Sequence, residues 1–137
     1  MARATILFAH GSRDPLWSQP MQAVAQRMRA LQPGVRVDCA YLELMQPDLA
    51  TAAHGCVADG CDEIVVVPMF LGVGSHARQD LPKLVATLKN ALPDVRFRLQ
   101  PAIGEDARVV DLLARVALDC AVVPAPAAQA IDANGQA

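Results

Sequence analysis

The sequence predicts a single α/β domain built on a parallel sheet of about four strands, with helices flanking the sheet. Short apolar runs of strand length alternate four times with longer segments in which apolar residues recur every three or four positions. Hydrophobic residues make up 53% of the 137 residues and charged residues 19%, which is typical of one compact domain with a sizeable core. Strands that alternate with helices form parallel sheets with right-handed crossovers.

The first strand is predicted at residues 5–9, which form a continuous apolar run typical of a buried strand. Asp14 is a favourable helix N-cap and Pro15 a favourable first helical residue, so we expect the first helix to begin there. Its apolar residues recur at spacings of four and three: Trp17, Met21, Val24, Met28 and Leu31. A Pro-Gly pair at residues 33–34 ends this helix.

The second unit combines an alternating strand with a short helix. Residues 35–42 alternate apolar and polar side chains, as a half-buried strand does. The helix is predicted from Pro47 and Asp48 to about Gly60. The apolar side chains on its inner face are small, so we expect this helix to pack close to the sheet.

The third and fourth strands complete the predicted sheet. Residues 64–70 form the most apolar run in the chain and are predicted to be a central strand. A glycine-rich turn at residues 72–76 follows, and then a helix over residues 77–92, with Pro82 near its first turn, where proline is tolerated. The fourth strand is predicted at residues 95–99.

The last helix is predicted to begin at Glu105 and Asp106, because acidic residues favour the first turn. Its apolar face comprises Val109, Leu113, Val116 and Cys120. We assign residues 1–122 to the folded domain. Residues 123–137 are rich in alanine and proline and weakly patterned, so we expect them to form a poorly ordered tail.

The composition argues against two classes of partner. A net charge of −2 argues against a nucleic acid bound through bulk electrostatics, and any anionic ligand needs a local basic cluster. No apolar stretch approaches the length of a membrane span. Met1 leads directly into the first strand without the pattern of a signal peptide. We therefore expect a cytoplasmic protein without a membrane partner.

The four cysteines, Cys39, Cys56, Cys61 and Cys120, are scattered and form no Cys-x-x-Cys pair. We interpret them as buried, reduced thiols. His54 with Cys56 and Cys61 matches no spacing known for zinc sites, so we interpret His54 as a surface or structural residue.

Two histidines and a glutamate are predicted to meet at one edge of the sheet. His10 ends the first strand, Glu43 follows the second, and His76 lies in the loop after the third. By analogy with flavodoxin-like sheets the strand order is 2-1-3-4, so a ligand binds at the switch point between strands one and three. Two imidazoles and a carboxylate suit a divalent first-row transition metal, and so few ligands leave the site open.

Each of these residues also has a plainer interpretation. His10 alone fits a strand end that bonds to backbone groups about as well as it fits a ligand. Glu43 alone is typical of a solvated loop residue. The pairing of His10 with His76 across one sheet edge favours the functional interpretation.

Further candidate residues surround this edge and are predicted to bind substrate. Arg13 and Arg78 can bind carboxylates through their guanidinium groups, whereas Lys83 is typical of ordinary surface charge. The turn before His76 supplies three more candidates: Gly72, Gly74 and Ser75. This turn is an incomplete phosphate-binding motif, so we expect its glycines mainly to give the backbone the freedom that lets His76 face the cleft.

Three segments of the chain resemble one family. "ILFAHGSRDP" near the start, "YLELMQPDL" in the middle and "VVVPMFLGVGSHARQDLP" after the third strand are similar to the small sirohydrochlorin chelatases of the CbiX type. The resemblance covers about residues 4–120. The resemblance rests on the combination of His-Gly-Ser-Arg with Gly-x-Gly-x-His-x-x-x-Asp, because either motif alone is only modestly specific for the family.

The resemblance implies the class II chelatase fold and an enzyme, a lyase, that inserts a divalent metal into sirohydrochlorin, a carboxylate-rich tetrapyrrole, in cobalamin or siroheme biosynthesis. It implies that His10 and His76 are catalytic and bind the metal, with Glu43 as a further metal ligand. We expect Co²⁺, with Fe²⁺ and Ni²⁺ as the other candidates. The metal is a substrate, and no organic cofactor is expected. An imidazole can accept a pyrrole proton as the metal enters the ring.

The resemblance also implies a homodimer, because longer relatives carry a second, similar domain and two small chains can build one cleft together. Two other functions stay open. A non-catalytic protein that binds metal or tetrapyrrole would use the same residues. Histidine phosphatases also place His-Gly after the first strand, but they normally have arginine before that histidine, where this chain has Ala9.

Overall fold

The computed structural model describes residues 2–119. They fall into two compact units, one ending at Asp106 and one beginning at Ala107. Each unit is described by itself. Within residues 2–119, no helix is long and apolar enough to cross a membrane.

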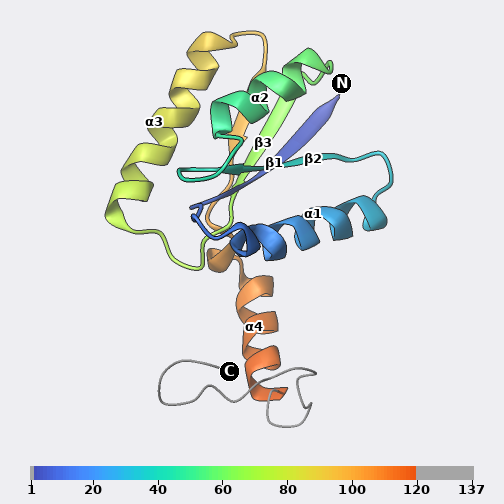
Figure 1. The fold of residues 1–137 in the computed structure, drawn as a ribbon, viewed down its shortest axis with the longest axis vertical. Helices are drawn as coiled ribbons and strands as arrows, with labels where there is room; N and C mark the ends of the chain where they lie inside the picture. Colours follow the sequence, from blue (N-terminus) through green and yellow to red (C-terminus); the bar gives the residue numbers. More distant parts are fainter. Residues whose placement is uncertain (1, 120–137) are drawn as a thin grey trace. The chain divides into compact units, whose positions relative to one another are not determined.

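The first unit is built on a four-stranded parallel sheet, as predicted (Figure 1). Its strands are β1 (Arg3–Ala9), β2 (Arg36–Tyr41), β3 (Glu63–Pro68) and β4 (Arg96–Leu99). They lie in the order β2-β1-β3-β4, so the order expected by analogy is confirmed. The switch point between β1 and β3 is therefore real, and the carboxyl ends of both strands meet at one edge.

The strands are connected by η1 (Pro15–Ser18), a short 3-10 turn, and by the helices α1 (Gln19–Leu31), α2 (Leu49–Ala58) and α3 (Ser75–Ala91). A second 3-10 turn, η2 (Ile103–Glu105), follows β4. The predicted cap at Asp14 is confirmed, because its carboxylate accepts a hydrogen bond of 2.9 Å from the backbone N–H of Leu16. The element that it caps is the 3-10 turn η1 rather than the first turn of α1.

The start of α3 differs from the prediction. It begins at Ser75 instead of residue 77, with Gly74 in an extended conformation as its N-cap. His76 therefore lies in the first turn of a helix and not in a loop. Pro82 lies inside the helix rather than near its first turn, and that prediction is wrong. The proline has no N–H to offer the Arg78 carbonyl, so one helical hydrogen bond is missing there.

Alternate side chains of β1 supply two separate cores, one on each face of the sheet. Ile6 and Phe8 pack with residues of α2 and α3, whereas Leu7 and Ala9 pack with residues of α1. Figure 1 shows α1 on the opposite side of the sheet from α2 and α3. Both faces of β1 are buried, which explains its continuous apolar sequence.

The second unit contains α4 (Ala107–Asp119). The helix carries the predicted apolar residues Val109, Leu113 and Val116, and none of its residues is buried. Cys120 and the predicted tail at residues 123–137 lie outside the described residues.

Candidate functional site

The segments that carry His10 and Glu43 are held together by their backbones. The N–H of Leu42 donates to the Ala9 carbonyl at 2.9 Å, and the N–H of Glu43 donates to the His10 carbonyl at 3.1 Å. These bonds continue the pairing of β1 with β2 past the ends of both strands. The sheet itself therefore brings the histidine and the glutamate to the same place.

Gly11 permits this close approach. A Cβ atom at Gly11 would lie 1.9 Å from the carbonyl oxygen of Glu43, and the φ angle of Gly11 is +101°, a conformation that side chains disfavour. Leu44, directly after Glu43, also has a positive φ, of 66°. Such strain is found where a loop must aim a functional side chain.

His10 and Glu43 form an imidazole–carboxylate pair. The distance from Nε2 of His10 to Oε1 of Glu43 is 3.2 Å, and the two side chains are 58% and 55% exposed. A carboxylate beside an imidazole can orient the ring and stabilise positive charge on it. Both groups are open to a ligand that arrives from solvent.

His76 faces the same pocket as His10. This pocket has a volume of about 100 Å³ and lies between the carboxyl end of β1, the segments after β2 and β3, and α3. The described residues that line it are Phe8, His10, Leu42, Phe70, His76, Ala77, Asp80, Leu81 and Leu84. The structure thus places His10 and His76 on one pocket at the predicted edge, His76 from the first turn of α3, while Glu43 pairs with His10 and is not among the residues that line the pocket.

The arrangement is open and incomplete as a metal site. Within residues 2–119, no three His, Cys, Asp or Glu side chains converge closely enough to hold a metal ion. Imidazole and carboxylate groups are good ligands for divalent first-row metals. A site with few ligands can take up such an ion and release it again, whereas a closed tetrahedral site retains it.

The other predicted residues are less closely grouped. Arg13 is exposed in the loop that begins at His10. Arg78 donates to the Val73 carbonyl at 3.1 Å and lines a neighbouring cavity of about 200 Å³ next to the end of β4. The turn residues Gly72, Gly74 and Ser75 are exposed directly before His76. None of these residues is among those that line the histidine pocket.

Sequence reasoning missed Asp80 and Leu84 as pocket residues. Both follow His76 on α3 at steps of four, so the three side chains share one face of the helix. Asp80 ends the Gly-x-Gly-x-His-x-x-x-Asp motif, but the motif did not assign it a place in a pocket. Leucines on this face also fit a plain core pattern.

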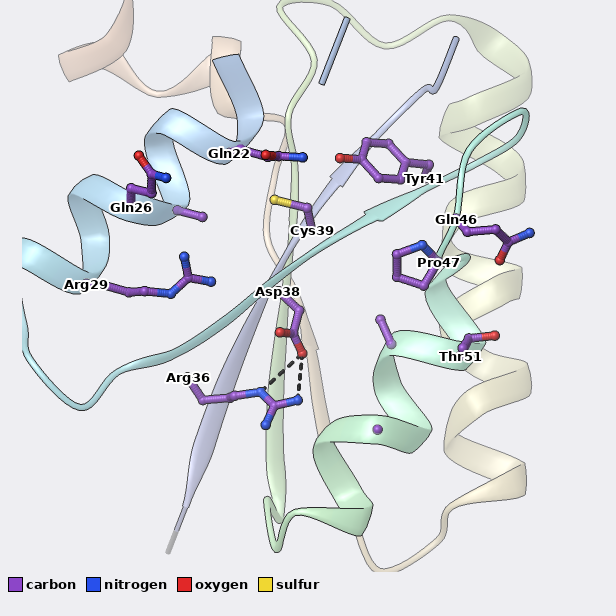
Figure 2. Close-up of a pocket in the computed structure, with 13 residues that line it drawn as sticks. Gln22, Gln26, Arg29, Arg36, Asp38, Cys39, Tyr41, Gln46, Pro47 and Thr51 are labelled. Atoms are coloured by element: carbon purple, nitrogen blue, oxygen red, sulfur yellow. Dashed lines mark hydrogen bonds and ion pairs between the residues drawn. The ribbon is translucent and has the colours of Figure 1, made fainter. Parts of the chain in front are cut away.

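A larger cleft lies elsewhere, along the outer edge of β2 between α1 and α2, and has a volume of about 520 Å³. Figure 2 shows Gln22, Gln26 and Arg29 projecting toward it from α1, with Thr51 on α2 across from them. Neither predicted histidine lines this cleft. Its walls mix polar side chains with apolar residues such as Ala25, Tyr41 and Ala52.

Much of this cleft serves to protect the sheet edge. Arg29 donates to the Val37 carbonyl at 2.8 Å, and the N–H of Tyr41 donates to the Pro47 carbonyl at 3.0 Å. Bonds like these occupy edge groups that would otherwise pair with another chain. We therefore interpret the cleft as part of the structure that covers the outer edge of β2.

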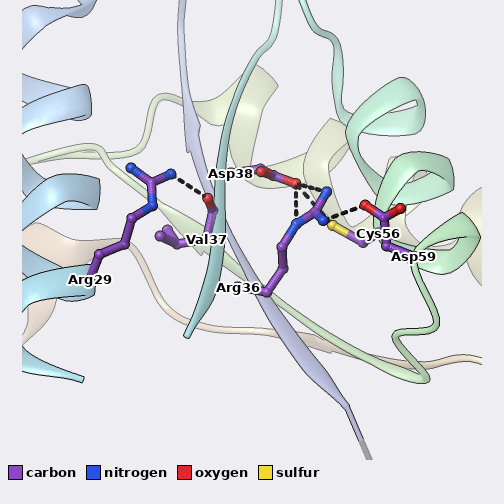
Figure 3. Close-up of polar contacts among 6 residues, drawn as sticks. All are labelled: Arg29, Arg36, Val37, Asp38, Cys56 and Asp59. Carbon is purple, nitrogen blue, oxygen red and sulfur yellow. Dashed lines mark hydrogen bonds and ion pairs between the residues drawn. The ribbon is translucent and has the colours of Figure 1, made fainter. Parts of the chain in front are cut away.

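A charge network lies on the α2 side of the same strand (Figure 3). Arg36 donates to Asp38 at 3.0 and 3.1 Å and also pairs with Asp59. The thiol of Cys56 donates to Asp38 at 3.1 Å. Burial, and then this hydrogen bond, raise the pKa of Cys56 to about 12, so the thiol stays protonated and unreactive at neutral pH.

His54 lies on the surface, as expected, and the expected burial of the cysteines is confirmed for Cys56 and Cys61 but not for Cys39. His54 is exposed on α2, where its Nδ1 lies 2.7 Å from the Ala50 carbonyl oxygen. Cys39, Cys56 and Cys61 are free thiols, and Cys56 and Cys61 are buried, whereas Cys39 is half-buried.

The model of the CbiX family matches residues 4–119. Among curated proteins, the sirohydrochlorin ferrochelatase of Bacillus subtilis (strain 168) is 31% identical over 110 residues, which cover 80% of this chain and 42% of that protein. The sirohydrochlorin cobaltochelatase of Sulfurisphaera tokodaii is 29% identical over 108 residues, covering 79% of this chain and 85% of that protein.

Among solved structures, the sirohydrochlorin chelatase SirB from Bacillus subtilis subspecies spizizenii, in complex with cobalt, superposes with a TM-score of 0.73 at 29% identity. The match covers 87% of this chain and 51% of the SirB chain. This chain therefore spans about half the length of the Bacillus relatives that it matches.

Proposed function

Because the chain belongs to the CbiX family, we propose that it is a sirohydrochlorin chelatase, an enzyme that inserts a divalent metal into this tetrapyrrole. The observation that carries the proposal is the pocket shared by His10 and His76 at the carboxyl edge of the sheet, with Glu43 paired to His10. The relatives named as ferrochelatase and cobaltochelatase support the same chemistry.

The reaction joins one metal ion to the ring and releases two protons. Metal–nitrogen bonds form as the N–H bonds of two pyrroles break, and the protons pass to nearby bases and then to water. We propose that His10 and His76 first hold the metal and then, as it moves to the ring nitrogens, accept the released protons on the nitrogens it has left, with Glu43 orienting His10 at 3.2 Å. Arg13 and Arg78 are proposed to attract the substrate's carboxylates from the surrounding surface.

The physiological metal is proposed to be Co²⁺, in the route to cobalamin, with iron insertion toward siroheme as the other candidate. The cobaltochelatase among the relatives and the cobalt bound to SirB support this proposal. Imidazole ligands alone accept several first-row metals. The metal preference of the enzyme is therefore measured with the metals in competition. The reduced thiols of Cys39, Cys56 and Cys61 fit the proposed location in a reducing cytoplasm.

The test is an assay in which absorbance reports metal insertion. Sirohydrochlorin is incubated with Co²⁺, Fe²⁺ or Ni²⁺, separately and in competition, with and without the protein. We expect the spectrum of the metallated ring to develop faster with protein, and fastest with Co²⁺. Binding of metal and tetrapyrrole with no gain over the rate without protein would instead establish the non-catalytic binding protein.

We also propose that two copies of the chain build the complete cleft. The histidine pocket measures about 100 Å³, whereas ligand pockets for molecules of drug size measure about 300–1,000 Å³. Large apolar side chains are exposed on the segments that follow β1, β2 and β3: Leu16, Trp17, Leu42, Leu44 and Leu71. Such a surface around an undersized pocket is suited to contact with a second copy.

Light scattering of Leu71→Lys tests the dimer. Leu71 is 70% exposed, so the change should leave folding intact. We expect the wild type to have the mass of two chains and Leu71→Lys that of one, with a loss of insertion activity. Leu31→Lys is the matched control, because Leu31 is 69% exposed at the end of α1, away from these segments. A wild type with the mass of one chain and full activity would contradict the proposal.

A further inference from the structure

His76 lies in a segment that adds no buried side chain to the core. None of residues 72–80 is buried, and the first buried side chain of α3 is that of Leu81. The other buried residues of this helix, Val85 and Leu88, pack in the core cluster between α3 and the sheet. The anchoring of α3 to the sheet therefore begins only after the turn that carries His76.

The chain directly before this segment is also fixed. The N–H of Gly104 donates to the Phe70 carbonyl at 2.9 Å. A Cβ atom at Gly104 would lie 2.1 Å from the carbonyl oxygen of Leu71, so the two backbones are in close contact there. Residues 72–80 thus connect two fixed points, and we call them the His76 arm.

The His76 arm is held together by bonds between its own residues. The backbone N–H of Arg78 donates to the Gly74 carbonyl at 3.0 Å, and the guanidinium of Arg78 donates to the Val73 carbonyl at 3.1 Å. Neither bond ties the arm to the rest of the protein. Both bonds therefore stay intact when the arm moves as one piece.

Both ends of the His76 arm are suited to bending. At one end, Pro82 lies inside α3 and has no N–H to donate to the Arg78 carbonyl, and prolines of this kind kink or weaken a helix. At the other end, a Cβ atom at Gly72 or Gly74 would meet nothing within 4 Å, so neither glycine is packed against a neighbour. Hinges in proteins are a few such residues at the ends of elements.

His10, by contrast, is fixed to the sheet. Its carbonyl accepts a hydrogen bond of 3.1 Å from the N–H of Glu43, and the preceding Ala9 carbonyl accepts one of 2.9 Å from Leu42. The two imidazoles that line the histidine pocket therefore differ. One is held by the sheet, and the other lies on the His76 arm.

We propose that the His76 arm moves during metal insertion and that Pro82 is a positioning residue that permits this movement. The inference rests on the proposed function. Within residues 2–119, no three His, Cys, Asp or Glu side chains converge closely enough to hold a metal ion. The arm brings His76 toward His10 as the metal is taken up, and withdraws it as the metal passes to the ring nitrogens.

Hydrogen exchange of the metal-free protein, followed by mass spectrometry, tests the mobility of the arm. We expect the amides of residues 79–81 to exchange faster than those of residues 85–88. Pro82→Ala supplies the missing N–H, so exchange at residues 79–81 should slow about fivefold, the effect of one net hydrogen bond. Equal exchange of the two stretches in the wild type would overturn the inference.

Pro82→Ala also separates a hinge from an ordinary structural residue. Alanine is a far better helix residue than proline, so the urea midpoint of unfolding should rise. We nevertheless expect kcat for Co²⁺ insertion to fall about fivefold, in step with the slower exchange, while the KM for sirohydrochlorin stays unchanged. A Pro82→Ala enzyme with the wild-type kcat would overturn the inference.

Thr87→Ala is the matched control on the same helix. Thr87 is exposed and lies on the anchored half of α3, beyond Pro82. Alanine is again the better helix residue, so the urea midpoint should rise. Exchange at residues 79–81 and kcat should both stay at their wild-type values, because the break at Pro82 remains. A fall in kcat equal to that of Pro82→Ala would overturn the assigned role of the hinge.

Co²⁺ alone, without tetrapyrrole, tests the direction of the movement. We expect saturating Co²⁺ to slow the exchange of residues 79–81 in the wild type, because the metal then holds His76 toward His10. In His10→Ala the fixed ligand is lost, so exchange should stay as fast as without the metal. Equal slowing in the wild type and in His10→Ala would contradict closure of the arm on His10.

The proposed function and this inference fail in different ways. If the wild type inserts no metal, the proposed function fails, while the exchange rates with and without Co²⁺ still show whether the His76 arm moves. If insertion proceeds and Pro82→Ala stabilises the protein at the wild-type kcat, the function stands and the role of Pro82 is wrong.

Discussion

The site depends on an approach of two backbone segments that only glycine permits. Gly11 lies against the carbonyl of Glu43, and His10 and Glu43 are joined there by a backbone hydrogen bond of 3.1 Å. The 3.2 Å contact between their side chains follows from this backbone arrangement. A change that separates the two segments should therefore separate the imidazole from the carboxylate.

Gly11→Ala is predicted to lower both stability and metal insertion. Its positive φ alone costs an alanine about 1–2 kcal/mol, and the clash with Glu43 adds to this. Gly34→Ala is the control, because Gly34 has a φ of +89° and open space around it. Urea titrations should show a lower free energy of unfolding in both variants, whereas only Gly11→Ala should lose metal-insertion activity. An active Gly11→Ala enzyme would refute this role of the loop.

Cys56 supplies a prediction for alkaline pH. Burial raises the pKa of its thiol from 9.0 to about 12. The folded protein therefore holds a proton that the unfolded chain releases above pH 9, so this contribution to stability falls as the pH rises from about 9 to about 12. The free energy of unfolding should decline less steeply over this range in Cys56→Val than in the wild type. Equal slopes would show that the thiol does not titrate as described.

At this scale the sequence predicted only part of the site. His10 and His76 were predicted because each ends or follows a strand and the motifs around them are specific. Neither Asp80, although it ends the motif around His76, nor Leu84 was predicted to line a pocket, because that depends on where α3 begins. The positive φ angles of Gly11 and Leu44 depend on contacts between loops, which periodicity does not contain.

Among the secondary-structure elements, α2 has a defined cap that can be tested. The carboxylate of Asp48 accepts a hydrogen bond of 2.8 Å from the N–H of Thr51. Hydrogen bonds from the Thr51 side chain and backbone hold the pKa of Asp48 below its ordinary value of 3.8. The folded state therefore favours the ionised form, and the contribution of the cap is present above pH 3.8 and lost as the pH falls through the lower folded pKa.

Asp48→Ala is predicted to cost about 1 kcal/mol of unfolding free energy at neutral pH. Asp48→Asn should cost less, because the amide oxygen can still accept the bond. The difference between wild type and Asp48→Ala should shrink below pH 3.8 in urea titrations. A difference that stays constant with pH would mean that the charge of Asp48 plays no part.

The strands and helices themselves were largely readable from the sequence. Apolar runs and alternation located all four strands of the sheet to within two residues, because burial on one or both faces leaves a clear pattern. The beginning of α3 was misplaced because a glycine-rich turn carries no periodic signal. Gly74 serves as N-cap without a side-chain hydrogen bond, so no capping residue marked the boundary.

At the scale of the whole molecule, topology explains why residues far apart in the sequence form one site. The order β2-β1-β3-β4 places β1 between the strands that precede Glu43 and His76. Parallel strands end at the same edge, so three separate segments meet there. The sequence suggested this strand order only by analogy, because local residue patterns do not show which distant strands pair.

The most direct measurement compares the chain's three histidines in one assay of Co²⁺ insertion into sirohydrochlorin. His10→Ala and His76→Ala remove the two residues proposed to act, and His54→Ala removes an exposed histidine on α2 that takes no part. We expect the first two variants to lose at least a hundredfold in kcat, the scale of a lost acid–base group, and His54→Ala to keep the wild-type rate. Full activity in both His10→Ala and His76→Ala would contradict the account.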